Sequence, residues 1–166
     1  MGAGDFESRW LRPDVNAVWT RFLQVTHRLE HHIDRRLQVN HGITHTQYEI
    51  LVRLADGDER AMRMSDLADV IVTAKSAVTY QVNKLSEMGL VERHKCDSDN
   101  RGTWVKLTPA GLERLEKAAP CILSLVRELF LDDLNCDQSA ELDKLLGTWS
   151  DNLDEHDRNP SHRPDH

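Results

Sequence analysis

The sequence predicts a mainly α-helical fold with a small β-hairpin, and neighbouring segments of the chain carry the prediction. Apolar residues recur at helical spacing over residues 65–71 and again over residues 73–88, where Gly89 ends the pattern. Residues 90–96 and 103–107 then alternate with the period of two that is typical of strands. Helix, turn, helix and hairpin in this order predict a winged helix-turn-helix, whose second helix can enter the major groove of DNA.

The segment 73–88 has the residues expected of a DNA-recognition helix. We expect Thr73 to be its N-cap, and Gly89 to adopt the left-handed conformation after the last turn with Leu90 folding back onto it. The apolar face consists of Val78, Val82, Leu85 and Met88. The polar face can contact base edges and phosphates, and it consists of Lys75, Ser76, Thr79, Tyr80, Asn83 and Lys84. An ordinary amphipathic helix would show the same pattern, and the hairpin behind it favours the DNA-binding interpretation.

The hairpin predicts the wing. Its tip, residues 97–102, is polar and rich in turn-forming residues. Within the tip, Asp99 can hold Arg101 extended so that the guanidinium enters a narrow minor groove. The alternative for this pair is a surface ion pair that contributes about 0–1 kcal/mol. The predicted DNA-binding residues are Ser65, Thr73, Lys75, Ser76, Thr79, Tyr80, Asn83, Lys84, Arg93, Lys95, Asp99 and Arg101.

Four stretches of this region resemble the MarR (multiple antibiotic resistance regulator) family in order and spacing. They are Val78-Thr79, Leu85 with Gly89-Leu90-Val91, Asp99-Asn100-Arg101, and Leu107-Thr108-Pro109-Ala110-Gly111. With the flanking helices, the resemblance covers about residues 15–153. It implies a homodimeric winged-helix transcription factor, often a repressor, that a small aromatic or phenolic ligand frequently releases from DNA. Many members carry arginine where this chain has Tyr80, so a base preference at that position does not carry over.

Length and composition set further bounds. A chain of 166 residues is expected to form one domain, residues 1–166. No apolar run approaches the roughly 20 residues that cross a bilayer. The N-terminus has neither the basic region nor the apolar stretch of a secretory signal. We therefore expect a cytoplasmic protein that does not bind membranes.

The charge is distributed unevenly along the chain. A net charge of −7 is unusual for a DNA-binding protein. The excess of acids lies from residue 132 onward, whereas residues 73–106 hold six bases and four acids, or +2. Because charges beyond about 8–10 Å are largely screened, the local charge governs phosphate contacts. It predicts moderate, salt-sensitive DNA binding.

Helices on both sides of the winged lobe, which spans residues 44–107, are predicted to pair two copies of the chain. Residues 14–40 and 108–155 carry more apolar residues at helical spacing than one small core requires. We therefore assign them to dimerisation and expect an obligate homodimer. Two recognition helices can then occupy the half-sites of a palindrome, roughly 10 base pairs apart.

Local signals mark the ends and interruptions of these helices. Thr44 and Gln47 have the spacing of a capping box. Pro120 lies inside an apolar stripe and predicts a kink or a break. Residues 156–166 are polar and contain two prolines, so we expect a flexible tail.

A ligand site is expected in the crevice between the dimerisation helices and the DNA-binding lobe, as the resemblance implies. Its predicted residues are Trp19, His27, His31, Tyr48 and Arg53. The aromatic side chains would stack on a ring, and Arg53 would pair with a carboxylate or phenolate. The alternative is that Trp19 and Tyr48 belong to the core and that Arg53 is solvated.

Three other functions remain open. His27 and His31 can share a helix face and chelate zinc in a metal-responsive regulator, although we predict no metal and no other cofactor. Cys96, next to Lys95 and near Arg93, can act as a redox switch. The third alternative is a winged-helix module that binds a protein instead of DNA.

The sequence lacks a phosphate-binding loop, a nucleophile elbow and a metalloprotease motif, so we expect no enzymatic activity.

Overall fold

The computed structural model describes residues 12–71, 73–95 and 102–158, apart from the side chains of Pro13, Asp14 and Lys95. The chain divides into two compact units, Met1–Leu125 and Val126–His166, and each is described by itself. The organisation of residues 1–166 as one domain stays a prediction.

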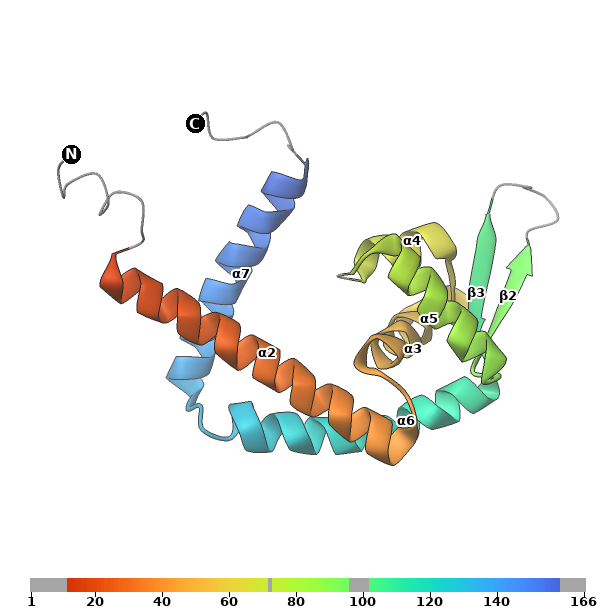
Figure 1. The fold of residues 1–166 in the computed structure, drawn as a ribbon, viewed down its shortest axis with the longest axis horizontal. Helices are drawn as coiled ribbons and strands as arrows, with labels where there is room; N and C mark the ends of the chain where they lie inside the picture. The colour runs from red at the N-terminus through yellow and green to blue at the C-terminus, as the bar shows by residue number, and fades with distance from the viewer. Residues whose placement is uncertain (1–11, 72, 96–101, 159–166) are drawn as a thin grey trace, which may run out of the picture. The chain divides into compact units, whose positions relative to one another are not determined.

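Helices dominate the first unit, where they pack around a small sheet (Figure 1). Its elements are α2 (Pro13–His41), α3 (His45–Asp56), the short 3-10 turn η1 (Asp58–Arg60), β1 (Ala61–Arg63), α4 (Met64–Val70), α5 (Lys75–Glu87), β2 (Val91–Lys95), β3 (Thr103–Leu107) and α6 (Pro109–Val126). The second unit contains the π-helical turn η2 (Arg127–Leu131) and α7 (Cys136–Arg158). The predicted fold class, mainly α-helical with a winged helix-turn-helix, is confirmed.

The sheet has three strands, one more than the predicted hairpin. β1 pairs antiparallel with β3, so that Ala61 lies opposite Lys106 and Arg63 lies opposite Trp104. β2 pairs with the other edge of β3, which gives the order β1-β3-β2. A strand of three residues that pairs with a segment far along the chain leaves no local pattern, so the sequence did not predict β1.

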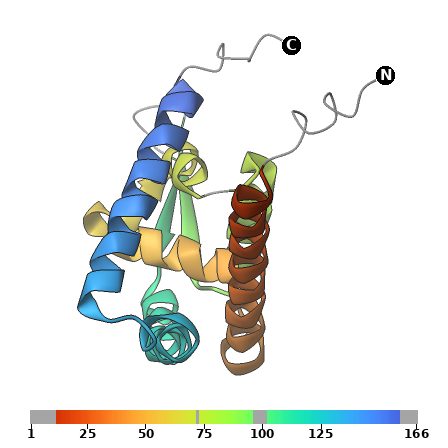
Figure 2. The same cartoon turned by 90° about the vertical axis from the view of Figure 1, so that its left-hand side faces the viewer.

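The core of the DNA-binding lobe lies between the sheet and its helices, and α3 passes across the sheet in Figure 2. Val78, Val82 and Leu85 of α5 have no exposed surface, and Val105 of β3 has none either. Leu107, two residues along the same strand face, is 5% exposed. The period of 3.6 in the helix and of two in the strand therefore predicted the inward faces of both elements.

The start of α5 differs from the prediction. Ala74 occupies the N-cap position, and its methyl group cannot accept a hydrogen bond, so the prediction of Thr73 as the cap is wrong. The backbone N–H of Thr73 donates to the carbonyl of Ile71 at 2.7 Å, and this tight turn places Thr73 before the helix. Met88 is 41% exposed and does not complete the apolar face as expected.

The end of α5 follows the prediction. Gly89 has a φ of 71°, in the left-handed region that favours glycine. Its N–H donates to the carbonyl of Ser86 at 3.0 Å, and the N–H of Leu90 donates to the carbonyl of Leu85 at 2.9 Å. These two bonds form a Schellman motif, and Leu90 is 3% exposed as its apolar partner. The motif directs the chain from α5 into β2.

The segment Leu107–Gly111 forms the junction between β3 and α6. The Thr108 hydroxyl donates to the carbonyl of Gly89 at 2.8 Å and accepts from the N–H of Gly111 at 3.0 Å. Thr108 therefore caps α6 and links it to the end of α5. A Cβ at Gly111 would lie 2.0 Å from the carbonyl oxygen of Leu90, so only glycine fits this close contact.

The junction between α2 and α3 is fixed by side chains. The predicted capping box is confirmed, because the N–H of Gln47 donates to the Thr44 hydroxyl at 3.2 Å and the N–H of Thr44 donates to Gln47 Oε1 at 3.0 Å. Asp34 Oδ1 accepts from the N–H of His45 at 2.8 Å. The C-terminal half of α2 is thus attached directly to the first helix of the lobe.

The last two helices differ from the prediction at Pro120 and at the C-terminal end. α6 continues through Pro120 without a break, although proline has no backbone N–H to donate to the preceding turn. α7 reaches Arg158, so the first three residues of the predicted flexible tail are helical. Residues 159–166 of that tail lie outside the described residues.

Candidate nucleic-acid interface

α5 presents its polar face to solvent. Val78, Val82 and Leu85 anchor the helix to the lobe, as described above, so the opposite face points outward. Its residues are exposed or half-buried, and they are Lys75, Ser76, Thr79, Tyr80, Asn83 and Lys84. Tyr80 is 58% exposed. The structure therefore brings all six predicted recognition residues onto one accessible helix face.

Two contacts at the start of α5 determine which charges and hydrogen-bonding groups are available to DNA. Lys75 Nζ lies 2.6 Å from Asp69 Oδ1 of α4, so its charge is partly neutralised in the absence of DNA. The Thr79 hydroxyl donates to the carbonyl of Lys75 at 3.0 Å. That bond uses the single proton of the hydroxyl and leaves its lone pairs for a base donor.

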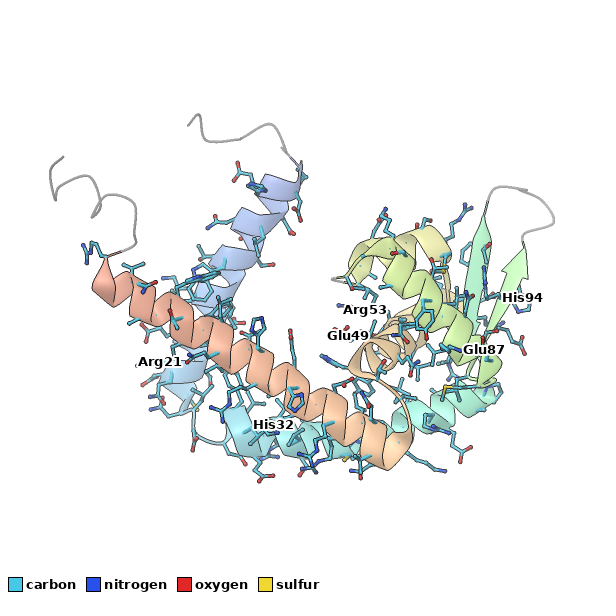
Figure 3. The ribbon with its side chains drawn as sticks, in the orientation of Figure 1. Arg21, His32, Glu49, Arg53, Glu87 and His94 are labelled. Atoms are coloured by element: carbon cyan, nitrogen blue, oxygen red, sulfur yellow. The ribbon has the colours of Figure 1, made fainter. Side chains whose placement is uncertain are left out.

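Tyr80 and Lys84 form a small cluster on the next turn. Lys84 Nζ lies 2.8 Å from Glu87 Oε2 and 5.8 Å from the centroid of the Tyr80 ring. The hydrogen bond and charge of Glu87 raise the pKa of Lys84 above its ordinary value. Figure 3 shows Glu87 at the C-terminal end of α5. The ammonium group is therefore fully charged at neutral pH.

Asn83 and Arg93 connect the recognition helix to the wing. Arg93 Nη1 of β2 donates to Asn83 Oδ1 of α5 at 2.5 Å. The carboxamide is held with its oxygen toward Arg93, and its two N–H donors remain for an acceptor on a base edge. This contact links β2 of the wing to α5.

The other predicted DNA-binding residues are distributed differently. Ser65 is exposed on α4, and its hydroxyl donates to Asp66 Oδ1 at 2.9 Å. Thr73 is exposed in the turn before α5. Asp99, Arg101 and the side chain of Lys95 lie outside the described residues.

Two pairs of residues at this interface were not predicted. Gln47, only 6% exposed, donates through Nε2 to Gln81 Oε1 at 2.9 Å and so ties the start of α3 to α5. Arg63 of β1 lies over the ring of Trp104 in β3. Both pairs join segments that are distant in sequence. Gln47 was recognisable only as a cap, and Arg63 only as an isolated base beside the first helix of the motif.

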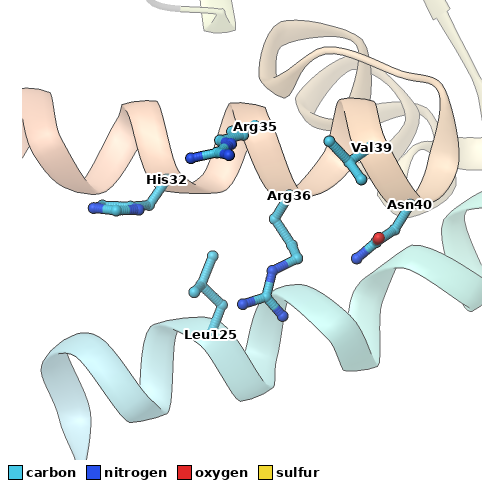
Figure 4. Close-up of a pocket in the computed structure, with 6 residues that line it drawn as sticks. All are labelled: His32, Arg35, Arg36, Val39, Asn40 and Leu125. Carbon is cyan, nitrogen blue, oxygen red and sulfur yellow. The ribbon is translucent and has the colours of Figure 1, made fainter.

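A pocket of about 410 Å³ lies between α2 and α6 (Figure 4). Its lining residues are His32, Arg35, Arg36, Val39, Asn40 and Leu125. In Figure 4 the side chain of Arg36 extends from α2 toward α6, and Leu125 extends from α6 toward α2. No lining residue carries a negative charge, so the pocket favours a small molecule with an anionic group and an apolar part.

The residues predicted to bind a ligand are not among those that line this pocket. Trp19 is 50% exposed and stacks on Phe22 with ring centroids 6.1 Å apart. His27 and His31 are exposed on α2, and Arg53 is exposed on α3, close to Glu49 in Figure 3. Tyr48 is half-buried, and burial raises the pKa of its hydroxyl, which stays protonated at neutral pH. The alternative that Trp19 belongs to the core is wrong for the single chain, because half of its surface is exposed.

The structure bears on the metal alternative only, because the redox alternative depends on Cys96, outside the described residues. Within residues 12–71, 73–95 and 102–158, no three histidine, cysteine, aspartate or glutamate side chains converge as metal ligands. Cys96 lies outside the described residues, and Cys121 and Cys136 are free thiols. In the same part of the chain, no helix combines the length and the hydropathy needed to span a bilayer.

An exposed polar helix beside a hairpin wing is the arrangement of winged-helix DNA-binding proteins. The model of the MarR family matches residues 43–103, from the turn after α2 to the first residue of β3. Taken with the relatives below, this match shows that the chain belongs to the MarR family. It is a DNA-binding transcriptional regulator and not an enzyme, as predicted.

Two MarR family transcriptional regulators from Streptomyces coelicolor have similar structures. Sco3205, solved in complex with DNA, is 33% identical with a TM-score of 0.83 and covers 87% of this chain and 90% of its own. AbsC is 37% identical with a TM-score of 0.82 and covers 88% of this chain and 98% of its own. The HTH-type transcriptional regulator YdgJ of Bacillus subtilis is 33% identical over 105 residues. That match spans 63% of this chain and 60% of the length of YdgJ.

Proposed function

We propose that the protein binds a palindromic operator as a homodimer and acts as a ligand-responsive repressor. The observation that carries the proposal is the exposed polar face of α5, which the buried Val78, Val82 and Leu85 hold outward. A helix with one fully buried face and one row of donors and acceptors suits insertion into a major groove.

The proposed contacts divide between two grooves. Residues of α5, with Ser65 and Thr73 before it, contact base edges and phosphates in the major groove. Arg101, held by Asp99, enters the adjacent minor groove, and Arg93 and Lys95 approach the phosphates between the two. The relative Sco3205, which was solved in complex with DNA, supports DNA binding by similarity.

Exposed apolar side chains on the terminal helices support the homodimer. On α2, Val15, Val18 and Val25 are 44%, 62% and 48% exposed. On α7, Leu145 and Leu153 are 45% and 67% exposed. Apolar residues at helical spacing on a surface of this kind are typical of an interface between subunits. We propose that both helices bind their counterparts in a second copy of the chain.

The ligand is proposed to be a small aromatic or phenolic acid. Two locations are distinguishable: the predicted crevice with Trp19, His27, His31, Tyr48 and Arg53, and the pocket between α2 and α6. The pocket is supported by Arg35 and Arg36, which face no acidic lining residue. A ligand changes DNA binding only if it binds the competent and incompetent arrangements with different affinity. Loss of ligand response in Arg53→Ala supports the crevice, and loss in Arg36→Ala supports the pocket.

The proposed target also sets where the protein acts. A regulator that binds an operator works in the compartment that holds the genome. We therefore keep the cytoplasm as the proposed location.

A selection of bound sites from random duplex DNA, at two salt concentrations, tests the proposal. The expected result is a palindromic consensus whose enrichment falls at the higher salt concentration. Arg101→Ala is expected to weaken binding and to reduce its salt dependence. If the protein retains no duplex at either salt concentration, DNA binding is rejected and a module that binds a protein is favoured.

A further inference from the structure

We propose that Arg63, on the outer face of the sheet, binds a phosphate of the DNA strand that borders the minor groove, with Trp104 as its positioning residue. The inference rests on the proposed function, because it requires a duplex in front of the wing. It adds to the interface a strand, β1, that precedes the helix-turn-helix.

The register of the sheet places Arg63 on the solvent side. Arg63 lies opposite Trp104, and Trp104 lies opposite His94, so the three residues form one row across the three strands. Paired residues in a sheet project to the same face. The neighbouring residue Val105 has no exposed surface, so it occupies the face turned to the helices. Figure 3 shows His94 on the outer side of β2.

The contact with Trp104 pre-orders the guanidinium. Arg63 Cζ lies 5.4 Å from the centroid of the Trp104 ring, within the range of a cation–π interaction. This interaction uses no N–H group, so it leaves the donors of the guanidinium for an anion. A side chain that is already held in place loses less conformational freedom when it binds a phosphate.

Gly102 places the guanidinium beside the wing tip. A Cβ at position 102 would lie 3.4 Å from Arg63 Nη1, so the guanidinium lies directly against the first described residue after the tip. Arg101, the residue before it, is the one proposed to enter the minor groove. A basic side chain beside that position would therefore face the phosphates along the edge of the groove, and not the edges of the nucleobases.

The charges of the outer face favour an anion. Lys106 is exposed on the same face as Trp104, two residues further along β3. Glu92 is the acid on this face, and its Oε2 lies 3.2 Å from His94 Nε2. Across the described ranges, from residue 12 to 158 with gaps at 72 and 96–101, no carboxylate pairs with Arg63. Its charge is therefore not neutralised there before DNA binds.

The chemistry selects a phosphodiester. A planar guanidinium binds two phosphate oxygens side by side, and such a contact carries no sequence information of its own. Each phosphate that a protein neutralises adds close to one to the slope of log affinity against log salt concentration. The proposed contact therefore has a signature that a purely structural arginine does not have.

The test measures this slope for the full-length protein on a random-sequence duplex, by fluorescence anisotropy over a salt series. Arg63→Gln is expected to make the slope shallower by about 1 per protomer. Arg63→Lys keeps the charge and is expected to keep the slope. Trp104→Leu is expected to weaken binding with little change of slope, since it removes the positioning ring and not the charge. Arg28→Gln, on an exposed part of α2, is the charge-matched control and is expected to leave the slope unchanged.

A second measurement locates the contact. Single phosphates of the duplex carrying the selected palindrome are replaced by uncharged methylphosphonates. At the contacted position, the substitution is expected to weaken wild-type binding and to have no further effect on Arg63→Gln. Additive losses at every position would overturn the proposal, as would an unchanged slope in Arg63→Gln. A lower melting temperature with an unchanged slope would assign Arg63 a structural role instead.

The failure of this inference is distinguishable from the failure of the proposed function. If wild-type protein binds no duplex, the DNA-binding proposal itself fails. If wild-type protein binds and the Arg63 variants bind with the same slope, only the contact at Arg63 is rejected.

Discussion

The DNA-binding lobe buries the apolar residues of its recognition helix, whereas the terminal helices leave many of theirs exposed. In α5, Val78, Val82 and Leu85 have no exposed surface. In α7, no described residue is buried, and Leu145 and Leu153 are 45% and 67% exposed. The lobe therefore completes its core within one chain, whereas α7 carries apolar surface that one chain leaves in water.

The same difference occurs within α2. Ile33 and Leu37, in its C-terminal half, are 8% and 0% exposed. Val15 and Val18, near its start, are 44% and 62% exposed. The C-terminal half of α2 is therefore buried when the single chain folds. The N-terminal part would be buried only when a second copy associates with it. Exposed apolar residues at helical spacing, rather than the length of the helix, therefore mark the surface that we propose for a second copy.

Placing charges on the exposed apolar stripe of α2 should have the greatest consequence for the protein. Val18→Asp combined with Val25→Asp would bury two unpaired carboxylates at the proposed interface, which costs several kcal/mol. We expect the dimer to dissociate and operator binding to be lost while the lobe stays folded. Sedimentation equilibrium and anisotropy measure the two effects.

The control for this variant is Thr20→Asp, which adds a carboxylate on another face of the same helix. It is expected to remain dimeric. If the double variant also stays dimeric and binds the operator, the assignment of α2 to dimerisation is wrong.

A second experiment separates the two regions by their dependence on protein concentration. Leu85→Ala removes a fully buried side chain and is expected to lower the free energy of unfolding by about 2–5 kcal/mol at any concentration. Leu145→Ala is expected to lower the unfolding midpoint mainly in dilute solution, because its contribution depends on association. Urea unfolding at two concentrations distinguishes them. Equal, concentration-independent losses would contradict the comparison.

A third experiment compares two glycines that have free space around them. Neither Gly89 nor Gly147 has an atom within 4 Å of an added Cβ. Gly89→Ala is expected to lower the free energy of unfolding by about 1–2 kcal/mol, because its φ of 71° is strained for alanine. Gly147→Ala, inside α7, is expected to raise it by about 0.5–1 kcal/mol. A destabilised Gly147→Ala would indicate that a contact fills the space beside α7.

The smallest expected effect concerns the surface of α6. Lys117 Nζ lies 2.6 Å from Glu113 Oε1, and its hydrogen bond and charge lower the pKa of Glu113. Because the folded pKa is depressed, the contribution of the pair is present above the unfolded pKa and is lost as the pH falls through the folded pKa. In Lys117→Ala, an NMR titration should find the Glu113 pKa higher than in wild type. An unchanged pKa would mean that the pair does not persist in solution.

Local patterns predicted much of the fold and of the recognition face. The capping box at Thr44, the turn at Gly89 and the buried face of α5 all follow from signals within a few residues. The cap at Thr73 was predicted wrongly, because the N–H of Thr73 donates to the carbonyl of Ile71 and the N-cap lies one residue later, at Ala74. Local propensity does not describe such a turn.

The parts that the sequence did not predict depend on pairing between distant segments. β1 is defined by its bonds to β3, and the contact of Arg63 with Trp104 exists only in that register. The pocket between α2 and α6 likewise needs residues from both helices. The sequence alone does not show which face of α2 packs toward α6. The predicted ligand residues of α2 therefore lie on one face of this helix, whereas His32, Arg35 and Arg36 line the pocket from another face.

Sedimentation of the protein with one palindromic duplex from the selection measures how many protomers bind each operator. We expect two protomers on each duplex, and a single step from free DNA to that complex as protein is added. One protomer stably bound to one duplex, or a folded monomer that leaves the duplex free, would contradict it.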